Sequence, residues 1–241
     1  MKKPESPRAI DLFCGLGGWT DGLLAEGWDV IGFDIERHQY GDAKYPAQLV
    51  LQDVLTLHGS QFRDADLIIA SPPCQAYSYR AMPWKKAKAL PPPDNSLFEA
   101  CFRIQREACE AAGRHIPLIV ENVRGAQKWV GRSRWNFGSF HLWGDVPALM
   151  PIAKAFRFDG QRQVVSVRDG CKGSGGSWFG DYQAMKAACD DGNKGFGSGL
   201  LGKNQMARMS SSKSKARKAA SAAIAKIPFP LASYIAATFR P

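Results

Sequence analysis

The stretch RAIDLFCGLGG, residues 8–18, decides the fold of this chain. Its first six residues are mostly apolar and predict a buried strand, and the glycines Gly15, Gly17 and Gly18 follow at once. Glycine adopts backbone conformations that other residues avoid, so the strand is expected to run into a tight turn. Residues 18–27 predict a helix after that turn. A strand, a glycine-rich turn and a helix in this order are typical of a ligand-binding edge in an α/β sheet.

Further strands and one long helix continue this pattern. The helix is predicted over residues 96–112, where Leu97, Cys101, Ile104 and Ala108 have helical spacing. The strands are predicted at DVIGF 29–33, QLVL 48–51, DLIIAS 66–71 and LIVEN 118–122. Strands that alternate with helices in short units predict an α/β fold with a doubly wound, mostly parallel sheet of the Rossmann-like kind.

The pattern weakens beyond residue 150. Residues 170–202 are rich in glycine, which marks a loop-rich excursion and not a second core. We therefore expect a catalytic and cofactor-binding domain over 1–154 and an irregular insertion over 155–212. Residues 213–241 are expected to form C-terminal helices that pack back on the first domain.

Composition limits the class of protein. A formal charge of +10 favours a polyanionic partner. No apolar run is long enough to span a bilayer and the N-terminus lacks a signal-peptide core, so the protein is expected to be soluble and cytoplasmic. The six cysteines form no close CxxC pair, which argues against both a metal site and a disulfide framework.

Acidic residues close the second and third predicted strands. Asp34 is placed to accept hydrogen bonds from a ribose, and Asp53 to reach an adenine amino group. The glycine-rich turn alone would also suit a nicotinamide-dependent oxidoreductase. It departs from the GxGxxG pattern of such enzymes, however, because Thr20 stands where the third glycine is expected.

The segment Ser71-Pro72-Pro73-Cys74-Gln75 is the sharpest chemical signal. Two prolines after a buried strand make a rigid turn that holds Cys74 at the edge of the sheet. Glu121 lies near the end of the next predicted strand. Because parallel strands end at one edge, a thiol and a carboxylate are expected to converge there on one substrate.

DLFCGLGG, SPPCQ and ENV, in this order, resemble the signature motifs of the DNA (cytosine-5) methyltransferase family. The resemblance covers roughly residues 8–145. It implies that S-adenosylmethionine gives a methyl group to carbon 5 of a cytosine that is flipped out of double-stranded DNA. It also implies that Cys74 adds to carbon 6 as the nucleophile and that Glu121 protonates or hydrogen-bonds ring nitrogen 3.

The resemblance also assigns the residues around these two groups. Asn122 is expected to hold the proline turn and the Cys74 loop. Ile35 is expected to lie against the adenine face, and Leu97 belongs to the segment that resembles the next cofactor-lining motif. The full expected cofactor site comprises Phe13, Gly15, Gly17, Gly18, Asp34, Ile35, Asp53, Pro72 and Leu97. No metal is implied.

The chain departs from the family pattern in two places. The family's Gln-x-Arg-x-Arg motif, one arginine of which contacts the cytosine carbonyl, has Gly131-Arg132-Ser133-Arg134 as its nearest match. Arg134 is the first candidate for that contact and Arg132 the second, with Gln161-Arg162-Gln163 as a weaker rival. The family's C-terminal Gly-Asn motif is absent, and residues 219–237 are expected to replace it beside the first strand.

Basic clusters are candidates for DNA contacts. One follows Cys74 and the other occupies the serine-rich segment 210–218, where a solvated linker is the alternative interpretation. The expected DNA-binding residues are Gln75, Arg80, Lys85, Lys86, Lys213, Lys215, Arg217 and Lys218. Family members usually carry a distinct target-recognition domain, and residues 155–212 are expected to form a reduced version of it. A chain this short would suit a phage or prophage enzyme, and no obligate protein partner is evident.

Three other hypotheses remain open at this point. The chain could be a catalytically silent DNA-binding relative, which the presence of both Cys74 and Glu121 disfavours. It could act on RNA or on a free pyrimidine nucleotide, since basic residues do not separate DNA from RNA. A nicotinamide-dependent oxidoreductase would fit the fold but does not explain the PPCQ segment.

Overall fold

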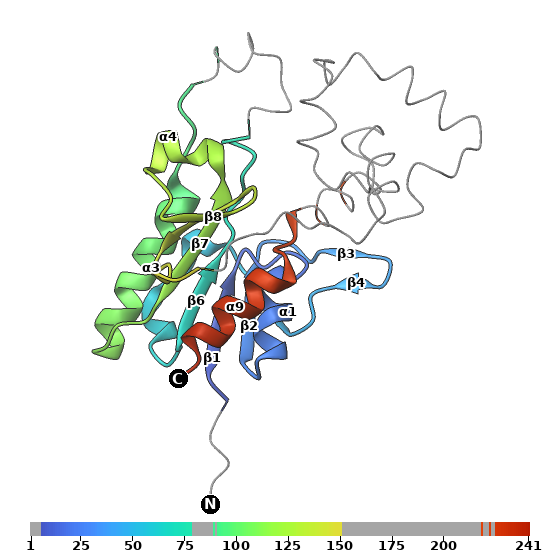
Figure 1. Cartoon of the computed structure of the whole chain (residues 1–241), viewed down its shortest axis with the longest axis vertical. Coiled ribbons are helices and arrows are strands. Elements are labelled where there is room, and N and C mark those ends of the chain that lie inside the picture. Colours follow the sequence, from blue (N-terminus) through green and yellow to red (C-terminus); the bar gives the residue numbers. More distant parts are fainter. Residues whose placement is uncertain (1–5, 79–88, 90, 151–217, 219–221, 223–224) are drawn as a thin grey trace, which may run out of the picture. The chain divides into compact units, whose positions relative to one another are not determined.

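The computed structural model describes residues 6–78, 89, 91–150, 218, 222 and 225–241. Its centre is a seven-stranded sheet in the order β5-β2-β1-β6-β7-β9-β8 (Figure 1). The first five strands in that order (β5, β2, β1, β6 and β7) are parallel to one another. Strand β9 is antiparallel to β7, and β8 is antiparallel to β9. The predicted α/β fold with a mostly parallel sheet is confirmed. The strands are β1 (Arg8–Leu12), β2 (Asp29–Asp34), β5 (Gln48–Leu51), β6 (Leu67–Ala70), β7 (Leu118–Val123), β8 (Trp135–Phe137) and β9 (Phe140–Gly144).

Helices cover both faces of this sheet. On one face, α3 (Ser96–Ala112) packs with the 3-10 turns η1 (Val54–Thr56) and η2 (Gly59–Phe62). On the other face lie α1 (Gly18–Ala25) and α9 (Phe229–Phe239), which contact each other. Shorter elements are the hairpin β3 (Gln39–Tyr40) and β4 (Ala43–Lys44), the turn η4 (Arg124–Ala126) and α4 (Gln127–Val130).

The strands divide their side chains between two apolar layers. Ile68 and Ala70 of β6 face the layer that contains α3, whereas Leu67 and Ile69 face the layer that contains α1 and α9. All four are fully buried, as expected for a parallel strand that is covered on both sides. On α1, Leu23 is buried in the core, whereas the next residue, Leu24, is 39% exposed.

The chain end from residue 225 packs against α1. The N–H groups of Ile227 and Ser233 lie so close to Gly18 and Gly22 that a Cβ on either glycine would collide with them. Trp28 also donates from Nε1 to the carbonyl oxygen of Ala236, 3.1 Å away. Residues 225–241 therefore pack against the first strand–helix unit.

The chain divides into two compact units, residues 1–151 with 225–241, and residues 152–224. The sequence places the corresponding boundaries at 154 and 213. The recognition role expected for 155–212 stays a prediction, because that segment lies outside the described residues.

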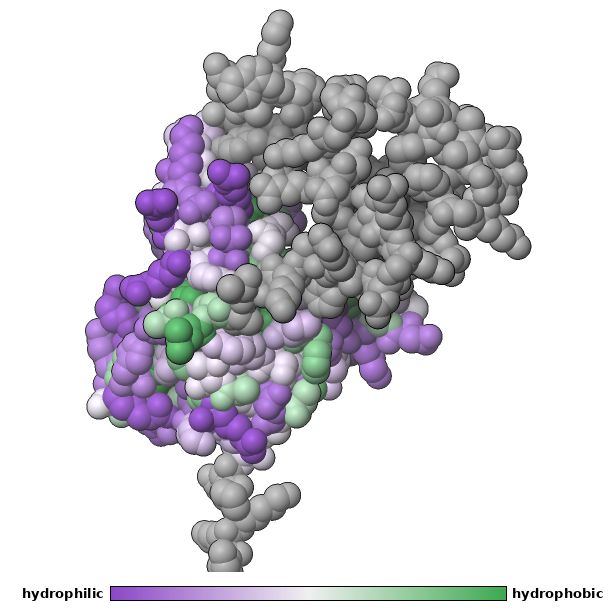
Figure 2. Space-filling model, viewed as in Figure 1, coloured by the Kyte–Doolittle hydropathy of each residue, from purple (hydrophilic) through white to green (hydrophobic). Residues whose placement is uncertain are grey.

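Hydrophilic residues cover much of the visible surface of the described part, with apolar patches between them (Figure 2). Within the described residues, no helix has both the length and the apolar character needed to cross a membrane. The same residues contain no cluster of His, Cys, Asp and Glu side chains suited to a metal ion.

Candidate active site

The glycine-rich turn between β1 and α1 has an unusual backbone. Phe13, Gly15 and Gly17 all have positive φ, at 59°, 51° and 74°. This conformation is costly for a residue with a side chain, so Phe13 must be held in it by its surroundings. The N–H of Cys14 donates to the carbonyl oxygen of Phe33, 3.1 Å away, and joins the turn to the end of β2.

Asp34 forms the second link between this turn and β2. Its Oδ2 accepts a hydrogen bond of 2.9 Å from the N–H of Gly15. Burial opposes ionisation of Asp34, but hydrogen bonds from His38 and from the N–H groups of Gly15 and Glu36 hold its pKa below the ordinary value. The carboxylate is therefore ionised at neutral pH and orients the turn.

The space beside the turn is open and has an apolar border. A Cβ on Gly15 would meet nothing within 4 Å, so a ligand can approach the backbone there. Ile35 directly follows β2 and is 73% exposed, while Leu51 and Leu55 nearby are 52% and 46% exposed. Exposed apolar side chains next to a buried carboxylate suit a ligand with a flat apolar part and hydroxyl groups.

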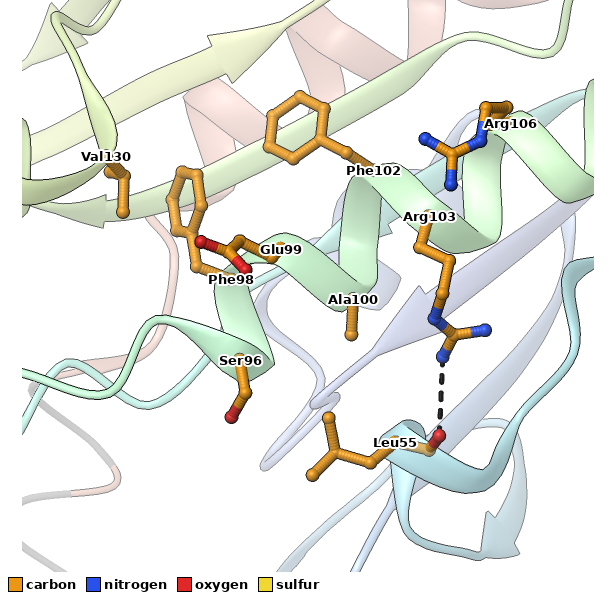
Figure 3. A pocket seen from close by; sticks show the side chains of 9 residues that line it. All are labelled: Leu55, Ser96, Phe98, Glu99, Ala100, Phe102, Arg103, Arg106 and Val130. Carbon is orange, nitrogen blue, oxygen red and sulfur yellow. Dashed lines mark hydrogen bonds between the residues drawn. The ribbon is translucent and has the colours of Figure 1, made fainter.

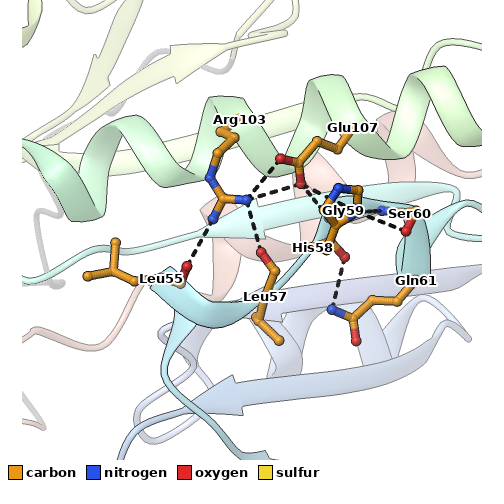
Figure 4. Close-up of polar contacts among 8 residues, drawn as sticks. All are labelled: Leu55, Leu57, His58, Gly59, Ser60, Gln61, Arg103 and Glu107. Carbon is orange, nitrogen blue, oxygen red and sulfur yellow. Dashed lines mark hydrogen bonds and ion pairs between the residues drawn. The ribbon is translucent and has the colours of Figure 1, made fainter.

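Asp53 begins the turn η1 at the end of β5. Its side chain accepts a hydrogen bond of 2.9 Å from the N–H of Leu55. Arg103 of α3 holds the same segment by donating to the carbonyl oxygens of Leu55 and Leu57, at 3.3 and 3.0 Å (Figure 4). Glu107 pairs with Arg103 at 3.0 Å and accepts the N–H of Gly59 at 2.6 Å. This network fixes Asp53 relative to α3.

The proline turn after β6 is also anchored from β7. Asn122 donates from Nδ2 to the carbonyl oxygen of Pro72 at 2.9 Å, and both residues are buried. Ser71 accepts a hydrogen bond of 3.0 Å from Trp19 Nε1 of α1. Cys74 follows this turn and is half-buried.

The backbone just after Cys74 forms a tight turn. The N–H groups of Tyr77 and Ser78 both donate to the carbonyl oxygen of Cys74 at 3.0 Å. The Tyr77 hydroxyl donates to Asn95 Oδ1 at 2.9 Å, and a Cβ on Gly125 would collide with the Tyr77 carbonyl oxygen. The segment 74–78 is thus tied to the regions before α3 and after β7.

Burial shifts the pKa of both Glu121 and Cys74, and the charge of Glu121 also acts on Cys74. Burial raises the pKa of Glu121 to about 8, despite a hydrogen bond with Ser71 that lowers it. Burial also raises the pKa of Cys74, and the charge of Glu121 raises it further. The two groups are therefore neighbours at the carboxyl edge of the sheet, and Glu121 is largely protonated at pH 7.

The structure does not bring Arg132 or Arg134 to these two groups. In the sheet, Leu142 of β9 lies opposite Trp135 of β8 and Glu121 of β7. Side chains opposite each other on neighbouring strands point to the same face, and Leu142 packs in the layer of α1 and α9, so all three side chains face that layer. Side chains alternate along a strand, which turns Arg134 to the opposite face. There, both arginines line a hollow of about 370 Å³ with Phe102 and Gln105 of α3, and with His115, Trp143, Gly144 and Asp145.

The remaining predicted site residues are dispersed. Leu97 lies in the first turn of α3 and is half-buried, and it is Phe98 that enters the core. Gln75 and Lys218 are exposed. Six of the predicted DNA-binding residues lie outside the described residues: Arg80, Lys85, Lys86, Lys213, Lys215 and Arg217.

A hollow of about 660 Å³ lies along α3 (Figure 3). Leu55, Phe98, Phe102 and Val130 contribute apolar walls, and Arg106 lies at one end. Neither Cys74 nor Glu121 lines it. It is therefore separate from the candidate catalytic pair.

The family model for C-5 cytosine-specific DNA methylases matches residues 8–130, which is just over half of the 241 residues. The chain belongs to this family. The matched residues include the glycine-rich turn, the proline turn with Cys74, and Glu121, so the resemblance predicted from the three motifs is confirmed. Arg132 and Arg134 lie just beyond the matched segment of this family member.

Three solved structures align with about half of this C-5 cytosine-specific methylase chain. A candidate DNA modification methyltransferase encoded within a prophage (E. coli) is 24% identical over 52% of this chain and 34% of its own, with a TM-score of 0.35. The S. pombe Dnmt2 methyltransferase is 18% identical over 52% and 36%, with a TM-score of 0.35. The Entamoeba histolytica methyltransferase EhMeth is 17% identical over 52% and 40%, again with a TM-score of 0.35. The chain spans about a third of the length of the first two.

Sequence reasoning missed several residues that shape this site in the family member. Ser71 stands within the SPPCQ motif but was not assigned its contacts with Trp19 and Glu121. Tyr77 anchors the turn after Cys74 through Asn95. No local pattern signals these pairs, because the partners are 18 to 52 residues apart in the chain.

Proposed function

We propose that this chain is an S-adenosylmethionine-dependent DNA (cytosine-5) methyltransferase that acts through a covalent adduct of Cys74. The observation that carries the proposal is the place of Cys74 after β6 and of Glu121 in the adjacent parallel strand β7, in a chain that belongs to the C-5 cytosine-specific DNA methylase family.

The residues around the turn fit the proposed cofactor. Asp34 and Asp53 offer carboxylate oxygens to the ribose hydroxyls and the adenine amino group. Ile35, with Leu51 and Leu55 near it, offers an exposed apolar surface to the adenine ring. The open side of Gly15 leaves room for close approach to the backbone. When bound, S-adenosylmethionine supplies a methyl group that is activated by a sulfonium centre.

Cys74 and Glu121 each carry out one part of the activation of cytosine. The Cys74 thiolate adds to carbon 6 of the ring while the Glu121 carboxyl gives its proton to nitrogen 3. The electron pair of the C5–C6 double bond then becomes available at carbon 5, which takes the methyl group. Because burial holds the pKa of Glu121 at about 8, this carboxyl carries the required proton at neutral pH.

Protonation of Glu121 also helps Cys74 to ionise. A charged Glu121 raises the pKa of the thiol, so a neutral Glu121 removes that repulsion. After methyl transfer, a base removes the proton from carbon 5. The electrons of the C5–H bond re-form the double bond and expel the Cys74 thiolate, and nitrogen 3 returns its proton to Glu121.

The DNA-binding surface is proposed from the charge of two basic clusters and from their positions in the sequence. The target cytosine must leave the base stack to reach a thiol at the sheet edge. The cluster Arg80, Lys85 and Lys86 follows Cys74 in the chain, and a second cluster extends from Lys213 to Lys218. Both are suited to phosphates, which fix the position of a protein on DNA without reading its sequence.

A mechanism-based trap tests the proposal. The protein is incubated with S-adenosylmethionine and mixed-sequence DNA duplexes that carry 5-fluorocytosine, and adducts are counted on denaturing gels. Fluorine at carbon 5 cannot leave as a proton, so elimination stalls and the adduct persists. Wild type should form the adduct and Cys74→Ser should not. Cys109→Ser, a second half-buried cysteine on α3, is the matched control and should form it.

Two outcomes would contradict the proposal. One is methyl transfer to ordinary DNA without any trapped adduct, which would remove the covalent role of Cys74. The other is methylation of RNA or free dCMP in preference to duplex DNA in a competition of the three substrates.

A further inference from the structure

A buried chain of hydrogen bonds crosses the base of the glycine-rich turn and takes no part in the proposed reaction. Thr20 Oγ1 donates to Asp11 Oδ2 at 2.6 Å and lies 2.8 Å from the Tyr45 hydroxyl. Asp11, Thr20 and Tyr45 are 1%, 0% and 7% exposed. When Asp11 is ionised, the single hydroxyl proton of Thr20 goes to Asp11, and the Tyr45 hydroxyl then donates to Thr20.

This chain of three residues, here called the clasp, joins both ends of the turn. Asp11 lies in β1 just before the turn, and Thr20 lies in the first turn of α1 just after it. Tyr45 comes from the segment between the β3–β4 hairpin and β5. The clasp therefore connects the start and the end of the turn to a third, distant part of the chain.

The Tyr45 ring and Pro46 also fill space that two glycines leave open. A Cβ on Gly32 of β2 would collide with the Tyr45 ring, and one on Gly17 would collide with the ring of Pro46. The aromatic ring thus packs against β2 and against the turn itself. The contact explains why glycine is required at both positions.

The turn needs such support because its conformation is strained. Phe13 has a φ of 59°, which a residue with a side chain rarely adopts. The hydrogen bond from Gly15 to Asp34 exists only if the turn keeps this shape. A loosened turn would move the backbone and Asp34 away from the positions that the proposed cofactor requires.

Burying the polar groups of the clasp is less favourable in free energy than burying apolar side chains. Asp11 Oδ1 is buried and has no hydrogen-bond partner among the described residues. Burial raises the pKa of Asp11 to about 7, and the hydrogen bond from Thr20 opposes this. Apolar side chains of similar volume would avoid this cost, so packing alone does not account for three polar groups here.

We propose that Thr20 and Tyr45 are positioning residues for S-adenosylmethionine, which act by clamping both ends of the glycine-rich turn through Asp11. The inference rests on the proposed function for the identity of the ligand. Tyr45 acts through Thr20, and neither hydroxyl needs to touch the cofactor.

Cofactor affinity of four variants tests the clasp, measured by calorimetry with S-adenosylmethionine and S-adenosylhomocysteine well below each melting temperature. Thr20→Val removes both hydrogen bonds and should raise Kd about tenfold, whereas Thr20→Ser keeps the hydroxyl and should stay within about twofold. Tyr45→Phe keeps the ring and should raise Kd about threefold. The double variant Thr20→Val/Tyr45→Phe should bind no more weakly than Thr20→Val, because Tyr45 acts through Thr20.

Matched controls remove similar groups elsewhere. Tyr234→Phe and Thr238→Val each delete a hydroxyl hydrogen bond on α9, and both should bind the cofactor like wild type. Circular dichroism checks that each variant is folded. If Thr20→Val does not fold, Thr20→Ser and Tyr45→Phe carry the comparison.

The outcomes separate the clasp from the proposed function. If wild type binds the cofactor and folded Thr20→Val has the same Kd, the clasp is overturned and the proposed function stands. If Thr20→Val does not fold, an unchanged Kd in Tyr45→Phe has the same meaning. A Thr20→Ser variant as weak as Thr20→Val would also overturn it, since the hydroxyl would then not be the cause. If wild type binds neither compound, the proposed cofactor is refuted. The role of the clasp in binding that cofactor is then refuted too.

Discussion

At the β1–β2 end of the carboxyl edge the candidate site is built from backbone, whereas at the β6–β7 end it is built from the buried Glu121 and the half-buried Cys74. The first end depends on three positive-φ residues and on the Gly15 N–H, which Asp34 holds. The second depends on Cys74 and Glu121: burial raises the pKa of both groups, and the charge of Glu121 raises that of Cys74 further.

Because of this difference, substitutions at the two ends should affect different properties of the enzyme. A backbone-built ligand site is sensitive to the shape of its turn, so substitutions there should alter binding. A site built from titratable side chains is sensitive to single atoms and to pH, so substitutions there should alter turnover. The four predictions below test this separation.

The largest effect is expected at Cys74. Cys74→Ser should lower kcat by about a thousandfold or more, because a hydroxyl is a far weaker nucleophile than a thiolate. Its Kd for S-adenosylmethionine should match that of wild type, since none of the proposed cofactor contacts involves the thiol. Labelled methyl transfer to DNA and calorimetry measure the two quantities. A large change in cofactor Kd would show that the two ends are not independent.

Glu121→Gln should lower kcat by about a hundredfold, because the amide cannot give a proton to nitrogen 3. It should also change the pH dependence of stability. The pKa of Glu121 rises from 4.5 to about 8 on folding, so its favourable contribution is complete below pH 4.5 and is lost as pH rises through 8. Asp11, whose pKa rises from 3.8 to about 7, acts in the same direction.

Thermal melting between pH 5 and pH 8 checks that sign. Wild type should melt at lower temperature as pH rises, and Glu121→Gln should lose part of that dependence. Glu110→Gln, an exposed residue on α3, is the control and should melt like wild type at each pH. A Glu121→Gln curve parallel to that of wild type would mean that Glu121 is already charged in the folded protein.

Asp34→Ala should weaken cofactor binding by about 1–3 kcal/mol, the range for hydrogen bonds to charged groups. It removes the proposed ribose contacts and also leaves the Gly15 N–H without its acceptor. The kcat at saturating cofactor should change much less than Kd. Asp29→Ala, at the other end of β2 and exposed, should leave both quantities unchanged. Equal losses for the two variants would remove Asp34 from the cofactor site.

The smallest effect is expected at Arg134. Its side chain lies on the α3 face, away from Glu121, so Arg134→Ala should change kcat/KM by no more than about twofold, as for an ordinary surface substitution. Steady-state methylation of DNA measures this ratio. A loss of about tenfold or more would show that DNA binding brings this arginine to the catalytic edge.

Much of this molecule was predictable from sequence because its strands are buried on both sides. LIIA and LIVEN have almost no polar alternation, so each is recognisable as a strand of a covered sheet, and the motifs stand at the strand ends. The strands β8 and β9 were harder. Their antiparallel direction depends on the pairing of β9 with β7, which no local pattern shows.

The sequence by itself determined the order of the elements, the family, and the expectation that Cys74 and Glu121 lie at one edge. Those properties follow from local patterns and from the rule that parallel strands end together. Only the tertiary structure decided that Arg134 faces α3, that Glu121 is buried enough to keep its proton, and that Asp11, Thr20 and Tyr45 meet. Each of these depends on segments far apart in the chain, because the face of a strand and the burial of a side chain are set by what packs against them.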